Sequence, residues 1–407
     1  MIISPPTISQ ANGEVCVSAR IEFQHAKLDL PETLWVSFPE DHAPLVSERA
    51  DGFVVSLVLL AMAIGEDIDV KGVLSPHLLY GLQTYQQAFC SLFPKMFKPV
   101  VIRCKQQMAP LSKGGAHAVA CAFSGGVDSF FTLWSHLPEN QPLLEFRLTH
   151  GVFVHGFDIL LEDEATFRAC QEAYDALFRS LGMRLLTART NVRRFLNRVD
   201  WPLAYGAALL AIPLVLGRGV RRFYVPADAP YVVSQPAGSD PRVAHLLSTE
   251  TLEVLHHGAG TSRVDKIKIL AQWPATYERL RVCWVKPDRL NNCCRCRKCL
   301  FVMAALEVFG ALARYHTFPL PLEGRRLRQW NWSTVIEYTP ALFEFRRHVV
   351  RRLIHHARQA GRRDLAFDLL CSLVQSWVLL QANRVQVAIK SFKRKRARAR
   401  RSSSTTQ

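Results

Sequence analysis

The chain has 407 residues, and its 51 Lys and Arg residues outnumber its 34 Asp and Glu residues, which gives a formal net charge of +17 at pH 7. Apolar residues make up 49% of the chain and charged residues 21%, as in ordinary globular proteins. These values exclude a disordered chain, a collagen-like repeat and a miniprotein held together by disulfides, and the length allows two or three domains.

Residues 1–115 are expected to form an N-terminal α+β domain. Three strands are predicted, over 15–23, 34–38 and 99–103, and two helices, over 53–64 and 78–92. Pro110 and the pair Gly114-Gly115 indicate a linker near 106–116. No residue of this region carries a chemical signature, so its role is left open.

Between residues 117 and 315, strands are expected to alternate with helices. The predicted strands cover 118–123, 151–155, 184–188, 222–226 and 251–256, and the helices cover 127–137, 162–181, 201–216 and 262–273. This alternation predicts the α/β class, with a doubly wound parallel sheet covered by helices on both faces. The charge-free run at 201–217 is shorter than the roughly 20 residues of a membrane span, so it is predicted to be a buried helix.

From residue 316 onward the chain is expected to be a helical C-terminal extension, ending near 389, with helices over 343–359 and 364–381. The stretch 390–401 then holds eight basic residues and no acidic one, and residues 390–407 are expected to be a disordered tail. The tail could bind an anionic macromolecule or simply solubilise the end of the chain, and both interpretations remain open.

The six residues after the strand at 118–123 combine glycines, hydroxyls and a carboxylate. They are Ser124, Gly125, Gly126, Val127, Asp128 and Ser129, and a predicted helix begins within them. The glycines let the backbone turn sharply and approach a ligand closely, and the start of a helix attracts anions. The serines can donate hydrogen bonds to phosphate oxygens, and Asp128 beside an anion indicates a bound Mg²⁺ ion. The string is neither a Walker A loop nor a dinucleotide-binding fingerprint.

This string resembles the signature loop of the PP-loop ATP pyrophosphatases. The resemblance implies a HUP-like fold in which the loop binds the pyrophosphate end of ATP. It also implies that AMP is transferred to a carboxylate or carbonyl oxygen, after which a nitrogen or sulfur nucleophile displaces it. By the same resemblance, the strand that ends at His155 lies beside the adenine.

Five of the eleven cysteines lie between residues 283 and 299. Cys293, Cys296 and Cys299 have the spacing C-x2-C-x2-C, and Cys283 precedes them. Four thiolates suit a structural, tetrahedral Zn²⁺ ion, although an iron–sulfur cluster can use the same ligands. Cys294 is a fifth thiol, and the spacing leaves open whether it or Cys293 is the ligand.

A PP-loop followed by this cysteine pattern resembles the 7-cyano-7-deazaguanine synthases, a family that binds zinc through a lone cysteine and a C-G-x-C-x-x-C run. Cys294 stands where that family usually has glycine. The resemblance covers about 117–305 and implies that ATP activates a deazaguanine carboxylate, to which ammonia is added. Similar proteins with extra domains occur in bacterial anti-phage gene clusters, so a macromolecular acceptor is also conceivable.

The other catalytic candidates open the last predicted helix of the domain. A cation over the α-phosphate would offset the charge that develops during AMP transfer, and Arg263 and Lys266 are the candidates for this role, together with Asp128. Polar residues that follow predicted strands, such as Asn191 and Asp228, are either further site residues or ordinary structural groups.

The sequence thus predicts an AMP-forming carbon–nitrogen ligase that uses ATP, Mg²⁺ and Zn²⁺. Its expected substrates are a small-molecule carboxylate and ammonia or another amine, and a homodimer is one option for its assembly. No secretory signal or membrane span is predicted, and reduced cysteines indicate the cytoplasm. Two alternatives remain: an enzyme that thiolates or amidates tRNA or another anionic acceptor, and a non-catalytic module that senses nucleotides or binds nucleic acid.

Overall fold

The protein is described by a computed structural model, which covers residues 1–25, 28–109, 118–231, 238–283, 285, 289–329, 340–379 and 381. It divides into two compact units, Met1–Cys293 with Arg314–Thr317 and Cys294–Ala313 with Phe318–Gln407. Most of the predicted linker and the whole predicted basic tail, 390–407, lie outside the described residues.

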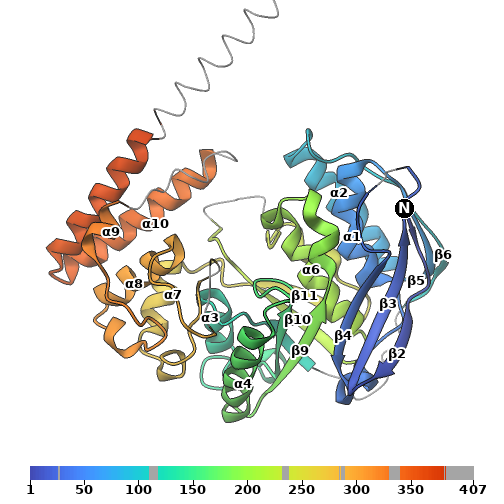
Figure 1. The fold of residues 1–407 in the computed structure, drawn as a ribbon, viewed down its shortest axis with the longest axis horizontal. Coiled ribbons are helices and arrows are strands. Elements are labelled where there is room, and N and C mark those ends of the chain that lie inside the picture. Colours follow the sequence, from blue (N-terminus) through green and yellow to red (C-terminus); the bar gives the residue numbers. More distant parts are fainter. Residues whose placement is uncertain are drawn as a thin grey trace, which may run out of the picture. The chain divides into compact units, whose positions relative to one another are not determined.

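One large sheet forms the centre of the first unit (Figure 1). Among the described residues it contains eleven strands: β1 (Ile2–Ile3), β2 (Thr7–Ala11), β3 (Glu14–Glu22), β4 (Thr33–Pro39), β5 (Ile68–Leu74), β6 (Ile102–Gln107), β7 (Ala118–Ala122), β8 (His150–His155), β9 (Arg184–Thr190), β10 (Val220–Pro226) and β11 (Glu253–His257). Their order is β11-β10-β7-β8-β9-β4-β3-β1-β5-β6, and β2 pairs with β3 outside this path.

Seven helices of this unit are α1 (Asp51–Ile64), α2 (Pro76–Leu92), α3 (Val127–Ser135), α4 (Glu164–Ser180), α5 (Val192–Phe195), α6 (Trp201–Val215) and α7 (Arg263–Leu270), counted within the described residues. In Figure 1, α3 and α4 lie on one side of β9–β11 and α6 lies on the other. The predicted mixed α/β structure with a large, mostly parallel sheet is confirmed. The predicted elements between 118 and 273 all occur, with ends that differ by a few residues.

The strand order reverses in the parallel part of the sheet. β7 comes first in the chain, β8 and β9 follow on one side of it, and β10 and β11 lie on the other side, all parallel. The chain leaves β7 through α3 and reaches β10 through α6, so the connections on the two sides of β7 run over opposite faces of the sheet (Figure 1). Such a reversal opens a crevice where open α/β sheets bind their ligands.

The sequence predicts a domain boundary near residue 115, but the structure shows one compact unit across this position. The sheet continues because β4 pairs antiparallel with β9, where Val36 is opposite Thr190. The side chain of Asn191 secures the junction: it accepts a hydrogen bond from the Trp35 amide (3.0 Å) and donates one to the Thr33 carbonyl (2.8 Å). Asn191, a site candidate in the sequence, therefore has a structural role here.

The two most apolar helices of the unit, α1 and α6, pack against each other. Helices that are hydrophobic on all sides are found in the interior of a protein, and most residues of both helices are buried, as predicted for 53–64 and 201–216. The contact is close at Gly52, where a Cβ atom would lie 2.7 Å from the carbonyl oxygen of Ala211 and 2.8 Å from Cγ2 of Val215.

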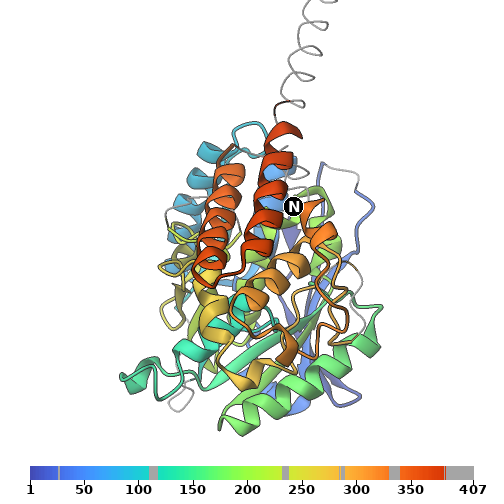
Figure 2. The same ribbon diagram turned by 90° about the vertical axis from the view of Figure 1, so that its left-hand side faces the viewer.

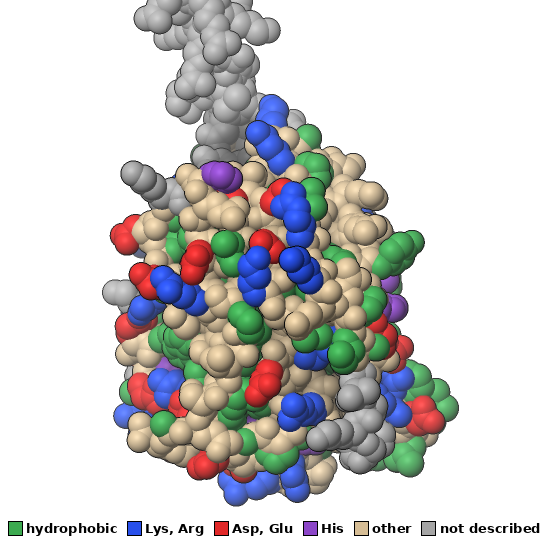
Figure 3. All heavy atoms as spheres, turned by 90° about the vertical axis from the view of Figure 1, so that its right-hand side faces the viewer, with side chains coloured by type: hydrophobic (Ala, Val, Ile, Leu, Met, Phe, Trp, Pro, Cys, Tyr) green, Lys and Arg blue, Asp and Glu red, His purple; other side chains and the backbone are tan. Residues whose placement is uncertain are grey.

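The N-terminal strands carry a surface of mixed charge. Figure 3 views the molecule from the side on which these strands lie in Figure 1, and Lys and Arg side chains there are interspersed with Asp and Glu. Exposed ion pairs contribute to this surface: Arg103 on β6 pairs with Asp67 beside β5 (2.8 Å), and Lys71 pairs with Asp69 within β5 (2.6 Å). Hydrophobic side chains are scattered over this face.

The second unit is helical, and the predicted helices over 343–359 and 364–381 fall within it. It contains α8 (Arg297–Val308), α9 (Gly324–Arg328), α10 (Pro340–Gln359) and a helix over 363–379. The chain reverses at Gly361, which has a φ of +74°, and the last helix then runs back (Figure 2). Arg362 stabilises this turn through ion pairs with Glu307 (2.7 Å) and Asp364 (2.9 Å). Within the described residues, neither unit has a helix that is long and apolar enough to span a membrane.

Substitution of Gly52 by Ala is expected to lower the free energy of unfolding by about 1–3 kcal/mol, because the new methyl group forces α1 away from α6. Urea denaturation of the full chain measures this change. Gly260→Ala is the matched control, since a Cβ atom there meets no atom within 4 Å, and it should change stability by less than about 0.5 kcal/mol. Equal stabilities of the two variants would contradict the described packing.

Candidate functional site

The loop 124–129 connects β7 to α3 and requires glycine at its turn. Gly125 has a φ of +74°, and a Cβ atom there would lie 1.8 Å from the hydroxyl oxygen of Tyr174 on α4. Gly126 is the N-cap residue of α3. Larger residues would therefore push the loop away from α4. The glycines allow the backbone to pass close to the buried aromatic side chains below it.

The first turn of α3 presents backbone N–H groups at the carboxyl edge of the sheet, because the first amides of a helix have no partner within it. The loop itself is held from within. Ser129 is buried and its hydroxyl donates to the Gly126 carbonyl (3.0 Å), while the Arg281 amide donates to the Gly125 carbonyl (2.8 Å). Ser124 is exposed and can reach a ligand. The loop thus has the features of an anion site.

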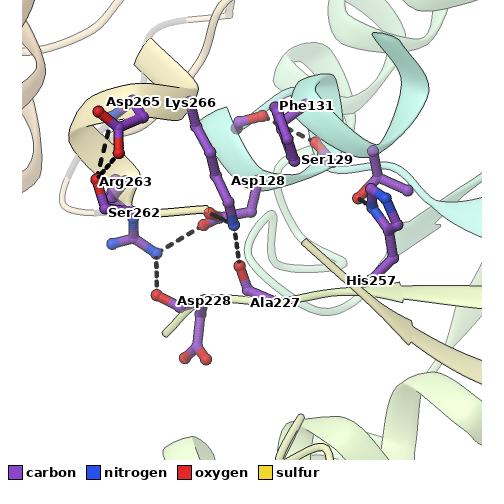
Figure 4. A network of polar contacts seen from close by, with 12 residues as sticks. Asp128, Ser129, Phe131, Ala227, Asp228, His257, Ser262, Arg263, Asp265 and Lys266 are labelled. Carbon is purple, nitrogen blue, oxygen red and sulfur yellow. Dashed lines mark hydrogen bonds and ion pairs between the residues drawn. The ribbon is translucent and has the colours of Figure 1, made fainter. Parts of the chain in front are cut away.

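Asp128 joins this loop to α7 (Figure 4). One carboxylate oxygen accepts a hydrogen bond from Nη2 of Arg263 (2.6 Å), and the other accepts one from Nζ of Lys266 (2.9 Å). The three predicted catalytic residues therefore lie together, although 135 residues separate Asp128 from Arg263. From the sequence, Asp128 was expected to bind Mg²⁺ and the two cations to bind phosphate. In the structure, Asp128 instead pairs with both cations.

The two cations also reach the strand on the other side of the reversal. Lys266 donates to the Ala227 carbonyl (2.7 Å) and Arg263 donates to the Asp228 carbonyl (2.8 Å), directly after β10. Ser262 fixes the start of α7, because its hydroxyl accepts from the Asp265 amide (3.2 Å). The cluster thus lies where the loops after β7, β10 and β11 converge, at the strand-order reversal.

The charges of this cluster stabilise one another. Burial by itself raises the pKa of Asp128, but Arg263 and Lys266 outweigh burial, so the pKa of this carboxyl is below its usual value. Burial lowers the pKa of Arg263, and the charges of Asp128 and Asp228 more than compensate, so its net pKa is raised. The carboxylate and the guanidinium are therefore both ionised at neutral pH.

His155, the predicted adenine neighbour, is enclosed at the end of β8. Its side chain is fully buried, it shares a hydrogen bond between Nε2 and the Leu160 carbonyl (2.7 Å), and its ring stacks on Phe167. Burial lowers its pKa. These contacts hold the imidazole inside the protein. His155 therefore has no exposed nitrogen in this structure.

Four thiol groups converge as the cysteine spacing predicts. The sulfur atoms of Cys283, Cys293, Cys296 and Cys299 all lie within 4.8 Å of one another. A tetrahedral zinc ion with Zn–S distances of about 2.3 Å separates its ligands by about 3.8 Å, so the cluster could hold such an ion. Asn292 holds the first ligand in place, because its Oδ1 accepts from the Val282 and Cys283 amides.

The cluster includes Cys293 and excludes Cys294, which resolves the alternative that the spacing left open. Cys294 is buried and has a φ of +55°, in the left-handed region that favours glycine. Glycine would adopt this conformation without the strain that a side chain brings.

Sequence reasoning missed two features of the site. The first is the pair of carbonyl groups of Ala227 and Asp228, which orient the cations and which only the fold brings to them. The second is Arg281, which is buried against the glycine loop. The position of Arg281 depends on a contact with residue 125 that no local pattern encodes.

Comparisons with known proteins give no match: no family model, curated protein or solved structure is significantly similar to this chain. The chemistry of the site is therefore interpreted from its residues and geometry.

Cys293→Ser and Cys294→Gly form a matched pair of neighbouring substitutions. The first removes a metal ligand, so it should abolish stoichiometric metal binding and lower the melting temperature, because structural metal binding is coupled to folding. The second should keep the metal and relieve about 1 kcal/mol of backbone strain. Elemental analysis by mass spectrometry measures the bound metal and distinguishes zinc from iron. Full metal content in Cys293→Ser would contradict the assigned ligand set.

Asp128→Asn should lower the free energy of unfolding by about 3 kcal/mol at pH 7, because it leaves Lys266, whose side chain is 3% exposed, without a counter-ion. Adding Lys266→Met should restore part of this loss. Since the folded pKa of Asp128 is depressed, the carboxylate stabilises the fold above the unfolded pKa of about 3.9, and this contribution disappears as the pH falls through the folded value. Urea denaturation measures the free energy of unfolding of the unsubstituted protein and of Asp128→Asn at pH 7 and near pH 3. The difference between the two proteins should be smaller at the lower pH.

Proposed function

We propose that the protein is an ATP-dependent, AMP-forming ligase of the PP-loop type, which activates a carboxylate as an acyl-adenylate and passes the acyl group to a nitrogen nucleophile. One observation carries this proposal. A glycine loop at a helix start and a carboxylate held by two cations, Arg263 and Lys266, meet at the strand-order reversal of a parallel sheet. The resemblance of the loop to the PP-loop signature agrees with this interpretation.

The residues present suit ATP and Mg²⁺. The loop amides and the exposed Ser124 would bind the pyrophosphate end of ATP. Asp128 offers the carboxylate oxygens that Mg²⁺ prefers, and the two cations offer partners for phosphate oxygens. In this proposal the ligand exchanges the partners of the cluster: Arg263 and Lys266 turn from Asp128 to phosphate, and Asp128 turns to the metal. Magnesium bound with ATP would reduce the charge of the phosphates.

The proposed reaction has two steps. A carboxylate oxygen of the substrate attacks the α-phosphorus, the bond from that phosphorus to the bridging oxygen breaks, and pyrophosphate leaves with the electron pair. A nitrogen nucleophile then attacks the acyl carbon and AMP leaves. Arg263 and Lys266 would stabilise the negative charge that develops on the α-phosphate in the first step. Their carbonyl contacts after β10 keep both cations close to the loop.

The sequence resemblance makes 7-carboxy-7-deazaguanine and ammonia the first substrates to test. The four-cysteine cluster fits a structural metal better than a catalytic one, because a catalytic zinc keeps an open position and commonly has mixed ligands. The alternative of a tRNA or another anionic acceptor rests on the basic tail, 390–401, which lies outside the described residues. No contact of the described residues favours that alternative.

The test is an analysis of the products of ATP cleavage. Purified protein is incubated with Mg²⁺-ATP, ammonium and 7-carboxy-7-deazaguanine, and in parallel with a panel of other carboxylates and RNA. AMP and pyrophosphate in equal amounts, dependent on the carboxylate, are expected. Lys266→Met should reduce the rate of AMP formation by a factor of about 100 or more. Removal of one group that stabilises charge in a transition state usually has an effect of this size.

Asp175→Asn is the control variant, because Asp175 forms an exposed ion pair with Arg179 on α4 and should leave the rate unchanged. ADP as the product would refute the AMP-forming reaction. ATP binding without cleavage over the whole panel would instead favour a nucleotide-sensing module.

A further inference from the structure

Arg281 is a buried cation with two guanidinium nitrogens that have no hydrogen-bond partner among the described residues. The residue is 4% exposed, and its Nε and Nη2 atoms form no hydrogen bond with any part of the described chain. A buried charge without a partner is costly, and proteins rarely retain one without a reason. The two unpaired N–H groups lie on the same edge of the planar guanidinium, and this edge matches two oxygens of one oxyanion.

The position of Arg281 connects it to the glycine loop. Its backbone amide donates to the Gly125 carbonyl (2.8 Å), and its carbonyl oxygen would lie 3.8 Å from a Cβ atom on Gly126. Its guanidinium acts electrostatically on Tyr174, whose hydroxyl group lies against Gly125. Arg281 is therefore joined to the turn that leads into α3 through its backbone, and its guanidinium acts on the tyrosine that lies against this turn.

Two titratable groups on which this guanidinium acts, Cys170 and Tyr174, are neutral. Burial raises the pKa of the Cys170 thiol to about 11 and that of the Tyr174 hydroxyl well above its usual value, although Arg281 lowers both. The thiol of Cys170 donates to the Arg289 carbonyl (3.6 Å). Neither group supplies a negative charge that would balance Arg281, and an anionic ligand would supply one.

The segment that carries Arg281 is held in a fixed conformation. Asn292 donates to the Leu280 carbonyl (2.8 Å) and accepts from the amides of Val282 and Cys283. Thr317 also donates to the Leu280 carbonyl (2.8 Å). The residues before and after Arg281 are therefore bound on both sides, and the side chain starts from a rigid backbone. A preorganised donor of this kind gains affinity, because little freedom is lost when the ligand binds.

We infer that Arg281 binds a phosphate group of the ligand that occupies the glycine loop, through a two-pronged contact from Nε and Nη2. This inference deepens the proposed function and names a second cationic site on the loop, separate from the Arg263–Lys266 pair. Phosphate is favoured over a carboxylate because the amides at the start of α3 and Arg281 are joined to the same turn. Together they suit an anion with several oxygens.

The test uses inorganic pyrophosphate as the probe and needs no turnover, so it stays informative if the proposed ligase reaction fails. Calorimetry measures the pyrophosphate affinity of the full chain and of Arg281→Met, Arg281→Lys and Arg279→Met. Arg279 is the matched control, because it lies two residues away and its guanidinium donates to the Ala173 carbonyl (3.1 Å) and the Ala275 carbonyl (3.4 Å). Melting temperatures without ligand are measured in parallel.

Arg281→Met should weaken pyrophosphate binding by about tenfold or more, the scale of a charge-assisted bidentate contact. Its melting temperature without ligand should stay the same or rise, because the substitution removes an unpaired buried charge. Arg281→Lys should weaken binding too, since a lysine cannot form the two-pronged contact. Arg279→Met should lower the melting temperature and leave the affinity unchanged.

Two results would overturn the inference. The first is unchanged pyrophosphate affinity in Arg281→Met together with a lower melting temperature, which would make Arg281 a structural residue. The second is the absence of pyrophosphate binding by the unsubstituted protein at millimolar concentration. A parallel titration with acetate tests whether Arg281 binds a carboxylate instead. If acetate binding depends on Arg281 and pyrophosphate binding does not, the phosphate assignment is also refuted.

Discussion

The arrangement of the site depends on one carboxylate. Asp128 stands in the first turn of α3 and binds two cations of α7, so it ties the loop after β7 to the loops after β10 and β11. Like charges at Arg263 and Lys266 would repel each other without it. The cluster is compact because each cation also has a backbone carbonyl acceptor. A ligand that enters here has to compete with an ion pair that already exists.

This competition gives the site a selective character. In the proposed function, a polyphosphate with a divalent metal competes best, because it offers both a new anion for the cations and a new cation for Asp128. The buried Arg281, whose amide donates to the Gly125 carbonyl, adds a further positive charge to this part of the molecule. The described residues thus surround the loop with more positive than negative charge, in the manner expected of a site for highly charged anions.

Local patterns in the sequence were sufficient for the parts of the fold that depend on neighbours in the chain. The small, apolar residues of β7, the glycine loop and the cysteine spacing each predicted the structure found there. The strand β5 was missed even though Ile68, Val70 and Leu74 alternate as buried residues, because Gly72 interrupts the pattern. Its signal was present but weak.

Contacts between distant segments could not be predicted in this way. The Asn191 side chain binds the backbone of residues 33–35, and Arg281 packs on residue 125, so both roles exist only once the sheet is assembled. The mutual pairing of Asp128 with Arg263 and Lys266 has the same origin. The sequence predicted that these three charged residues lie near the ends of strands. Which of them pair with one another follows from the order of the strands in the sheet.

The antiparallel pairing of β4 with β9 has a consequence for how the chain folds. The hydrogen bonds of β4 on this side join residues near 36 to residues near 190, so this edge stays open while the ribosome synthesises the intervening segment. Contacts so far apart in sequence form late and slow folding. An exposed strand edge of this kind is also a site for wrong pairing between nascent chains. The N-terminal region therefore depends on the middle of the chain for protection against aggregation.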